Sequence, residues 1–235
     1  MQPKILYEDE DILVVRKPAG IAVQTGHIGQ QDVESELKNY LAKAFGGIGG
    51  SPYLGVIHRL DQPVEGLLVF AKNKKAAASL SAQLSAGDFC KEYMAVVWGG
   101  PDTAHKEGTL VNYLTKAGNR ALIQETPGSA DAKRAVLHYT KLAHAVVEGE
   151  AISLLCVRLE TGRFHQIRAQ LSHADMPILG DRAYGSPISQ AFSGNVGINR
   201  PALCAGHLVF RHPTTDVEME YQTDSDNPAF TYFNV

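Results

Sequence analysis

Residues 56–72 read VIHRLDQPVEGLLVFAK and place the charged group HRLD between two apolar runs. The runs at 56–57 and 67–70 have the composition of buried strands. A buried charge costs free energy unless an opposite charge or hydrogen bonds compensate it. Two interpretations follow: Arg59 and Asp61 belong to a structural ion pair, or they belong to an active site. If this segment is an extended strand, the two side chains lie on the same side of it, because they occupy alternate positions.

The 235 residues suit one continuous domain, and we expect a single domain over residues 1–235. The three cysteines are far apart and form no CxxC pair, which is typical of reduced cysteines in the cytosol. The first residues contain no leader-like pattern, and no apolar run approaches the ~20 residues of a membrane span. We therefore expect a soluble, cytoplasmic protein with no membrane partner.

The formal net charge of -3 neither favours nor excludes a nucleic-acid partner. Charges beyond about 8 Å are largely screened at physiological salt, so a local basic surface can act within an acidic whole. Basic side chains gather between 158 and 182, and acidic ones between 216 and 226. This segregation permits an anionic partner, while two ordinary solvated surfaces explain it equally well.

The pattern of apolar residues and turn residues predicts an α+β fold with a mixed, mostly antiparallel sheet and flanking helices. Thr161 is a candidate cap for the third helix. The predicted strands are 5–7, 12–15, 92–98, 108–114, 121–124, 134–143, 152–159, 203–210 and 217–221, with a further strand in the HRLD stretch. The predicted helices are 32–45, 74–86 and 162–174, and residues 186–201 are predicted to form a long surface loop.

Besides HRLD, two segments carry side chains suited to chemistry. The third predicted helix carries Arg163, His165 and Arg168, with a polar stripe running beside an apolar one formed by Phe164, Ile167 and Leu171. Tyr93 lies in a strand that otherwise appears buried. Taken singly, each of these residues is more typical of structure than of catalysis.

Several other functions fail on motif spacing. A kinase catalytic loop needs HRD, whereas Leu60 separates Arg59 from Asp61, and no GxxxxGK[ST] loop is present. The nine histidines form no HExxH motif, so no metal site is predicted. A glycosidase that uses two carboxyl groups stays open, because Glu65 is an acidic neighbour of Asp61.

Four segments in order resemble the RluA-type pseudouridine synthases over roughly residues 5–210. They are KPAG at 17–20, HRLDQPVEGLLVFAK at 58–72, KEYMAVVWG at 91–99, and LETGRFHQIRAQLSHADMPILGDRAYG at 159–185. The resemblance implies the pseudouridine synthase catalytic fold with a central active-site cleft. It also implies isomerisation of uridine to pseudouridine in structured RNA, ribosomal or transfer, without a cofactor or metal. Relatives often carry an S4-like module, and here a stand-alone catalytic domain, monomeric by default, is expected.

The resemblance also implies roles for individual residues. Asp61 corresponds to the catalytic nucleophile, Arg168 to the arginine that pairs with it, and Tyr93 to the tyrosine that packs against the target base. Arg59 corresponds to the arginine that fills the space left by the extruded base, and Ile167 to an apolar residue of the uracil pocket. Candidate substrate contacts, chosen for their charge and place in these segments, are His165, Arg163, Lys17, Lys72 and Arg182.

The chain departs from the family pattern at two places. Relatives commonly have HRLDxxTSG where this chain has HRLDQPVEG, and many have threonine where this chain has Phe164. These changes leave Asp61, Tyr93 and Arg168 in place, so we expect activity with altered RNA contacts. Two alternatives stay open: a weakly catalytic RNA-binding or chaperone-like protein of the same fold, and a nucleoside glycosidase.

Overall fold

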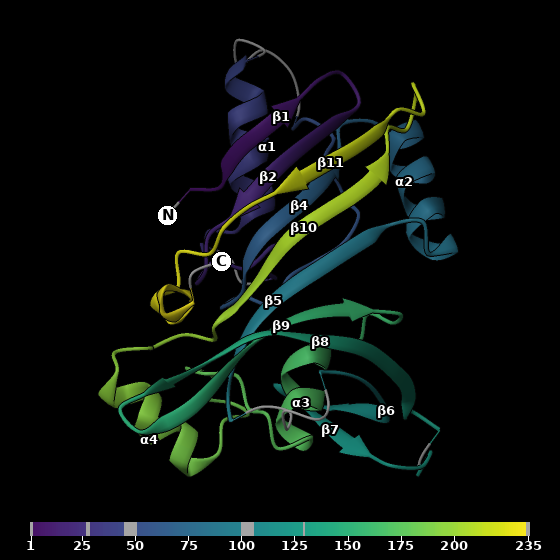
Figure 1. Cartoon of the computed structure of the whole chain (residues 1–235). Coiled ribbons are helices and arrows are strands. Elements are labelled where there is room, and N and C mark those ends of the chain that lie inside the picture. The colour runs from purple at the N-terminus through teal and green to yellow at the C-terminus, as the bar shows by residue number, and fades with distance from the viewer. Residues whose placement is uncertain (1, 27–28, 45–50, 100–105, 129, 234–235) are drawn as a thin grey trace. The chain divides into compact units, whose positions relative to one another are not determined.

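The computed structural model describes residues 2–26, 29–44, 51–99, 106–128 and 130–233. It consists of two compact units (Figure 1). Unit 1 comprises Met1–Lys91 and Ala205–Asp224, and unit 2 comprises Glu92–Cys204 and Ser225–Val235. The unit boundaries fall within two strands, β5 (Cys90–Trp98) and β10 (Leu203–Arg211). The expectation of one continuous domain stays a prediction.

Unit 1 is a sheet with two helices. Its strands follow the order β1-β2-β4-β10, with β11 paired to β10 and β3 paired to β4. The register of β1 with β2, of β2 and β3 with β4, and of β10 with β11 is antiparallel in every case. The bounds are β1 Lys4–Glu8, β2 Ile12–Lys17, β3 Gly55–Val56, β4 Glu65–Ala71, β11 Glu218–Gln222, α1 Val33–Ala44 and α2 Lys74–Ala86.

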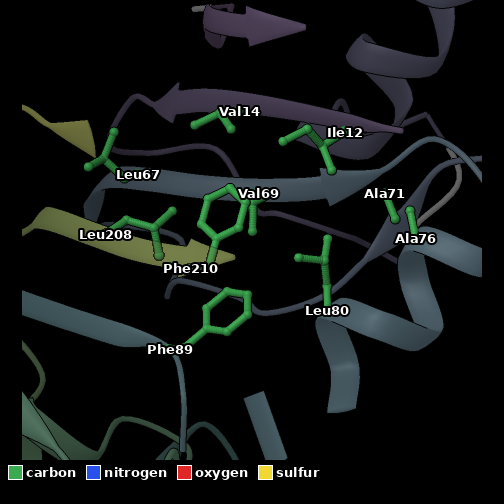
Figure 2. Close-up of a cluster of buried hydrophobic side chains, with 10 residues drawn as sticks. All are labelled: Ile12, Val14, Leu67, Val69, Ala71, Ala76, Leu80, Phe89, Leu208 and Phe210. Atoms are coloured by element: carbon green, nitrogen blue, oxygen red, sulfur yellow. The ribbon is translucent and has the colours of Figure 1, made fainter. Parts of the chain in front are cut away.

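The core of unit 1 lies between the sheet and α2. Figure 2 shows the Ala76 and Leu80 side chains of α2 directed at residues of β2, β4 and β10. The rings of Phe89 and Phe210 stack with their centroids 5.6 Å apart. Asn73 caps α2 by accepting a hydrogen bond from the Ala76 amide, as expected for a helix that begins at this point. This core packs β2 and β4 against α2, and the HRLD stretch leads directly into β4.

Unit 2 is an antiparallel sheet packed on α3. Its strands follow the order β5-β9-β8-β6-β7, and every register described for these strands is antiparallel. A small core of buried Leu114, Ala121, Ala135, Ala169 and Tyr184 joins α3 to β6, β7 and β8. The bounds are β6 Glu107–Ala117, β7 Arg120–Gln124, β8 Lys133–Val147, β9 Glu150–Leu159, α3 Gln166–His173, α4 Pro187–Asn195 and the 3-10 helix Pro228–Tyr232.

The third predicted helix begins later than expected. The structure has α3 at Gln166–His173 rather than from Gly162, and His165 at its start adopts a left-handed backbone with φ 53°. The Thr161 hydroxyl donates to the Gln166 side-chain oxygen, which also accepts from the Arg163 amide, so Thr161 does not cap the helix. Gln166 is buried and its amide donates to the Val136 carbonyl. The N-cap residue of α3 is His165, which makes no side-chain capping hydrogen bond, so the predicted cap at Thr161 is wrong.

Two further predictions are corrected. Residues 186–201 are not a loop throughout: Ser186 accepts a hydrogen bond from the Ser189 amide and begins α4, with Pro187 at its first turn. The HRLD residues lie between β3 and β4 rather than in a strand. The predicted end of α1 at Gly46-Gly47 lies outside the described residues. Within the described ranges, the helices are too short or too polar to cross a bilayer.

Candidate active site

Asp61 lies in a turn that is tied to the segment after β2. The Val64 amide donates to the Asp61 carbonyl at 3.0 Å and closes the turn. The Gly20 amide donates to the Gln62 carbonyl at 2.8 Å, and the Gln62 side-chain amide donates back to the Gly20 carbonyl at 3.0 Å. This reciprocal pair joins the HRLD stretch to the KPAG stretch. Two of the four segments that carry the family resemblance are therefore in direct contact in unit 1.

Lys17 is the buried support of this turn. Its side chain has no exposed surface, and its ammonium group donates to the carbonyls of Pro18, Ile21 and Gln62 at 3.0, 2.7 and 3.1 Å. Burial lowers the pKa of Lys17 to about 8, while the carboxylates of Asp61 and Glu65 act in the opposite direction. The three hydrogens of the ammonium have protein acceptors, so a contact of Lys17 with an RNA phosphate would have to replace one of them, and this contact stays a prediction.

Lys72 is also engaged within the protein. Its ammonium pairs with Glu8 at 2.7 Å and donates to the Asp9 carbonyl. This side chain ties the end of β4 to the turn between β1 and β2, and its contact with RNA phosphate stays a prediction. Arg59, by contrast, is exposed, as its predicted insertion into RNA requires, and that role stays a prediction.

The acidic departure in the HRLD loop is buried. Glu65 is 3% exposed and lies 3.7 Å from a guanidinium nitrogen of Arg16. Glu65 and Asp61 are the two carboxylates that raise the pKa of Lys17 and so partly oppose the effect of its burial. The glutamate that stands where relatives commonly have serine is therefore buried, close to Arg16, and acts with Asp61 on the charge of Lys17.

His58, the first residue of HRLD, is a neutral structural group. Its Nε2 accepts a hydrogen bond from the Val69 amide at 3.3 Å, and its ring meets Phe89 edge to face. Burial, with a smaller effect of the Lys91 charge, lowers the pKa of His58 to about 3. The imidazole is therefore uncharged at neutral pH, where it holds the segment before Asp61 against β4.

In unit 2, Arg168 forms a buried bidentate pair with Asp181. The Nε and Nη2 atoms of Arg168 donate to the two Asp181 oxygens at 2.7 and 2.9 Å, and both side chains are almost fully buried. Asp181 also accepts from the amides of Ala183 and Tyr184. Asp181 was missed in the sequence, although it lies in the ILGDRAYG part of the fourth segment. A bidentate pair fixes the plane of the guanidinium.

The other predicted residues of unit 2 divide into buried and exposed groups. Tyr93 on β5 and Ile167 on α3 are buried, at 6% and 5% exposure. Arg163 and Arg182 are exposed, and Arg163 donates to the Arg134 carbonyl at 3.0 Å. The His165 Nδ1 lies 2.9 Å from the Tyr184 hydroxyl.

The helix that carries Arg168 and Ile167 is anchored by a second buried amide. Gln170 has no exposed surface, and its side-chain nitrogen donates to the carbonyls of Leu110 and Ala135 and to the side chain of Asn112. Together with Gln166, it joins α3 to β6 and β8, beside which α3 lies in Figure 1. Asp61 belongs to unit 1 and Arg168 to unit 2, so their pairing and the cleft around them stay predictions.

The comparisons with known proteins agree with these motifs. The family model described as RNA pseudouridylate synthase matches residues 11–173. Ribosomal large subunit pseudouridine synthase D of Zymomonas mobilis is 35% identical over 94% of this chain and 68% of its own length. The uncharacterized RNA pseudouridine synthase YlyB of Bacillus subtilis is 34% identical over 94% of this chain and 69% of its own. The chain thus spans about two thirds of the length of these relatives.

A solved structure supports the fold. Human RNA Pseudouridylate Synthase Domain Containing 4 superposes with a TM-score of 0.74 at 23% identity, covering 97% of this chain and 89% of that one. This likeness confirms the predicted α+β fold with a mostly antiparallel sheet. On the family match and the identity to these relatives, the chain belongs to the RNA pseudouridylate synthase family, a family of isomerases.

Proposed function

We propose that this chain converts uridine in structured RNA, ribosomal or transfer, into pseudouridine, with Asp61 as the nucleophile. The observation that carries the proposal is the Asp61 turn itself: it is clamped to the KPAG stretch and stands over a buried ammonium whose charge the Asp61 carboxylate influences. The family's own name for the reaction gives the chemical class.

The reaction exchanges one bond to the ribose for another. The N1–C1′ bond breaks, the uracil turns while bound, C5 bonds to C1′, the C5 proton leaves, and N1 takes a proton, so atoms balance without an added reactant. An aspartate can serve by adding to C6 of the ring, or by assisting at the sugar as charge develops at C1′. Both routes need Asp61 as a carboxylate in a site dry enough to hold a base.

A cation lies beside this turn: the Lys17 ammonium donates to the Gln62 carbonyl, and the Asp61 carboxylate acts on the charge of Lys17. In the proposal Arg168 supplies a second cation, with its guanidinium oriented by Asp181. Asp181 acts as a positioning residue, because it fixes the plane in which Arg168 meets the nucleophile.

The binding of RNA is assigned to the remaining candidates. Tyr93 would supply a flat surface for uracil, and stacking of a base on an aromatic ring is worth ~1–3 kcal/mol. That approaches the few kcal/mol needed to extrude a nucleotide, and Arg59 would fill part of the vacated space. Arg163 and Arg182 stay as phosphate contacts because both are exposed. The proposed enzyme works in the cytoplasm as a monomer.

The test identifies both the product and the nucleophile. RNA from cells that lack this gene is incubated with the purified chain, digested to nucleosides and separated by chromatography. We expect pseudouridine from the wild type and from Asp88→Asn, an exposed carboxylate of the same unit, and none from Asp61→Asn. Release of free uracil would instead identify a glycosidase. Full turnover by Asp61→Asn would reject the assigned nucleophile, and RNA binding without any product would identify a binding protein.

A further inference from the structure

An exposed aromatic ring lies at the start of α3. Phe164 is 39% exposed, although the sequence pattern places it on the apolar side of the helix. Its ring stacks on the neighbouring His165 ring, with centroids 3.7 Å apart and planes 20° apart. The ammonium of Lys116, from the end of β6, lies 4.8 Å from the centre of the Phe164 ring. Phe164 is thus one layer of a stack that remains open to solvent.

The side chains that support the Phe164 ring are held in place. His165 is held in a left-handed backbone conformation, and its Nδ1 lies 2.9 Å from the Tyr184 hydroxyl. Tyr184 is buried, its hydroxyl accepts from the Ala121 amide at 2.6 Å, and the Arg168 guanidinium lies over its ring. An aromatic ring that is already held in place loses little conformational entropy when a planar ligand stacks on it.

The surroundings of Phe164 are cationic. Lys116, Arg120 and Arg163 are exposed, and the residues that the structure describes include no carboxylate paired with any of them. Arg120 lies over the ring of Tyr184 and donates to the Ala183 carbonyl, so it borders the same stack from β7. Proteins commonly bind single-stranded nucleic acid with an aromatic ring and nearby cations. A base stacks on the ring, and the cations contact the phosphates of the nucleic acid.

We propose that Phe164 and Lys116 form a stacking subsite for one unpaired nucleotide of the RNA, outside the nucleotide that reacts. The base lies on the Phe164 ring in place of the flexible Lys116 side chain, which turns to the adjoining phosphate together with Arg120. The subsite rests on the proposed function for the identity of its partner, RNA.

Stacking is tested with binding measurements on a short fluorescein-labelled single-stranded RNA of mixed sequence, and on an abasic oligomer of the same length. We expect Phe164→Ala, Phe164→Leu and Phe164→Thr to weaken binding of the RNA about 5- to 100-fold, and Phe164→Trp to retain it. The abasic oligomer should bind the wild type and these variants equally. Ile188→Ala, which removes an exposed apolar side chain of α4, is the matched control.

The charge is tested by repeating the measurement at several salt concentrations. Lys116→Gln should reduce the slope of log K against log salt by about 0.7, whereas Lys75→Gln, an exposed lysine of α2, should leave it unchanged. Wild-type affinity for RNA in Phe164→Ala, or retention of affinity by Phe164→Leu, would overturn the stacking subsite. An equal loss on the abasic oligomer would also overturn it, because no base is then involved.

The same variants separate this inference from the proposed function. In the uridine isomerisation assay, Phe164→Ala should raise KM and leave kcat unchanged. If the wild type forms pseudouridine and Phe164→Ala keeps its RNA affinity and KM, the subsite alone is rejected. If the wild type forms no pseudouridine while Phe164→Ala loses affinity, the proposed function is rejected and the subsite stands.

Discussion

Replacing Lys17 with methionine removes the ammonium beneath the Asp61 turn while keeping a long, unbranched side chain. The three carbonyls that accept from this ammonium lose their donor, and the carboxylates of Asp61 and Glu65 lose a cation. One of those carbonyls belongs to Gln62, the residue after Asp61. The substitution therefore tests whether Lys17 holds the nucleophile's turn.

The magnitude follows from two opposing effects. Hydrogen bonds to a charged group contribute ~1.5–3 kcal/mol each, so three contribute at most about 5–9 kcal/mol. The drop in the pKa of Lys17 from 10.5 to about 8 corresponds to a cost of about 3 kcal/mol for burying the charge, and methionine avoids that cost. We expect the free energy of unfolding to fall by about 2–6 kcal/mol.

The assay is urea unfolding followed by far-ultraviolet circular dichroism, together with pseudouridine formation below the unfolding transition. Lys75→Met, on the exposed surface of α2, is the control and should change the free energy of unfolding by no more than ~0.5 kcal/mol. We expect Lys17→Met to lose both stability and kcat. An unchanged urea midpoint together with a wild-type kcat would refute the assignment of Lys17 as a support of the turn.

Three further changes probe the same framework. The pKa of Lys17 is lower in the folded chain than in the unfolded one. The free energy of unfolding of the wild type, relative to that of Lys17→Met, should therefore rise from pH 8 to 10.5 while the activity of the wild type falls. Unfolding curves and rate profiles over this pH range would show both. Asp181→Asn leaves the buried Arg168 without its anionic partner, so unfolding should become easier by ~3–5 kcal/mol with a lower kcat; wild-type values for both would contradict the pairing. Gly66 has φ +132°, and the Cβ of a Gly66→Ala variant would lie 2.4 Å from the backbone of β10. Urea unfolding should show that Gly66→Ala loses more stability than Gly87→Ala, because Gly87 also has a positive φ but a Cβ there would meet no other atom.

The sequence predicted the elements whose pattern is local. Alternating or continuous apolar residues located β2, β4 and β9, and an alanine-rich stretch closed by Gly87 located α2. The start of α3 could not be found in this way. The helix begins after His165 without a side-chain cap, and the Thr161 hydroxyl bonds instead to the Val136 amide and the Gln166 side chain. A local capping rule therefore chose Thr161 wrongly.

The candidate site shows the same division. The order of the four motifs identified Asp61, Tyr93 and Arg168 as candidates, because those residues lie in recognisable segments. The burial of Lys17 was not predicted. Its ammonium donates to the Gln62 carbonyl, 45 residues away, and no local pattern encodes such a contact.

Asp181 escaped notice for a related reason. Its partner Arg168 is 13 residues away on another element, and an aspartate after glycine is ordinarily read as a turn residue. The exposure of Phe164 was likewise not predicted, because Phe164 lies before the start of α3 rather than on its apolar side.

The central claim is that the Asp61 carboxylate drives the formation of a carbon–carbon bond between uracil and ribose. Bonding of C5 to C1′ expels the hydrogen at C5, so RNA labelled with tritium at C5 of uridine releases tritium to water as this bond forms. The account predicts release by the wild type and Asp88→Asn, and none above background by a folded Asp61→Asn. Equal release by wild type and Asp61→Asn would contradict it.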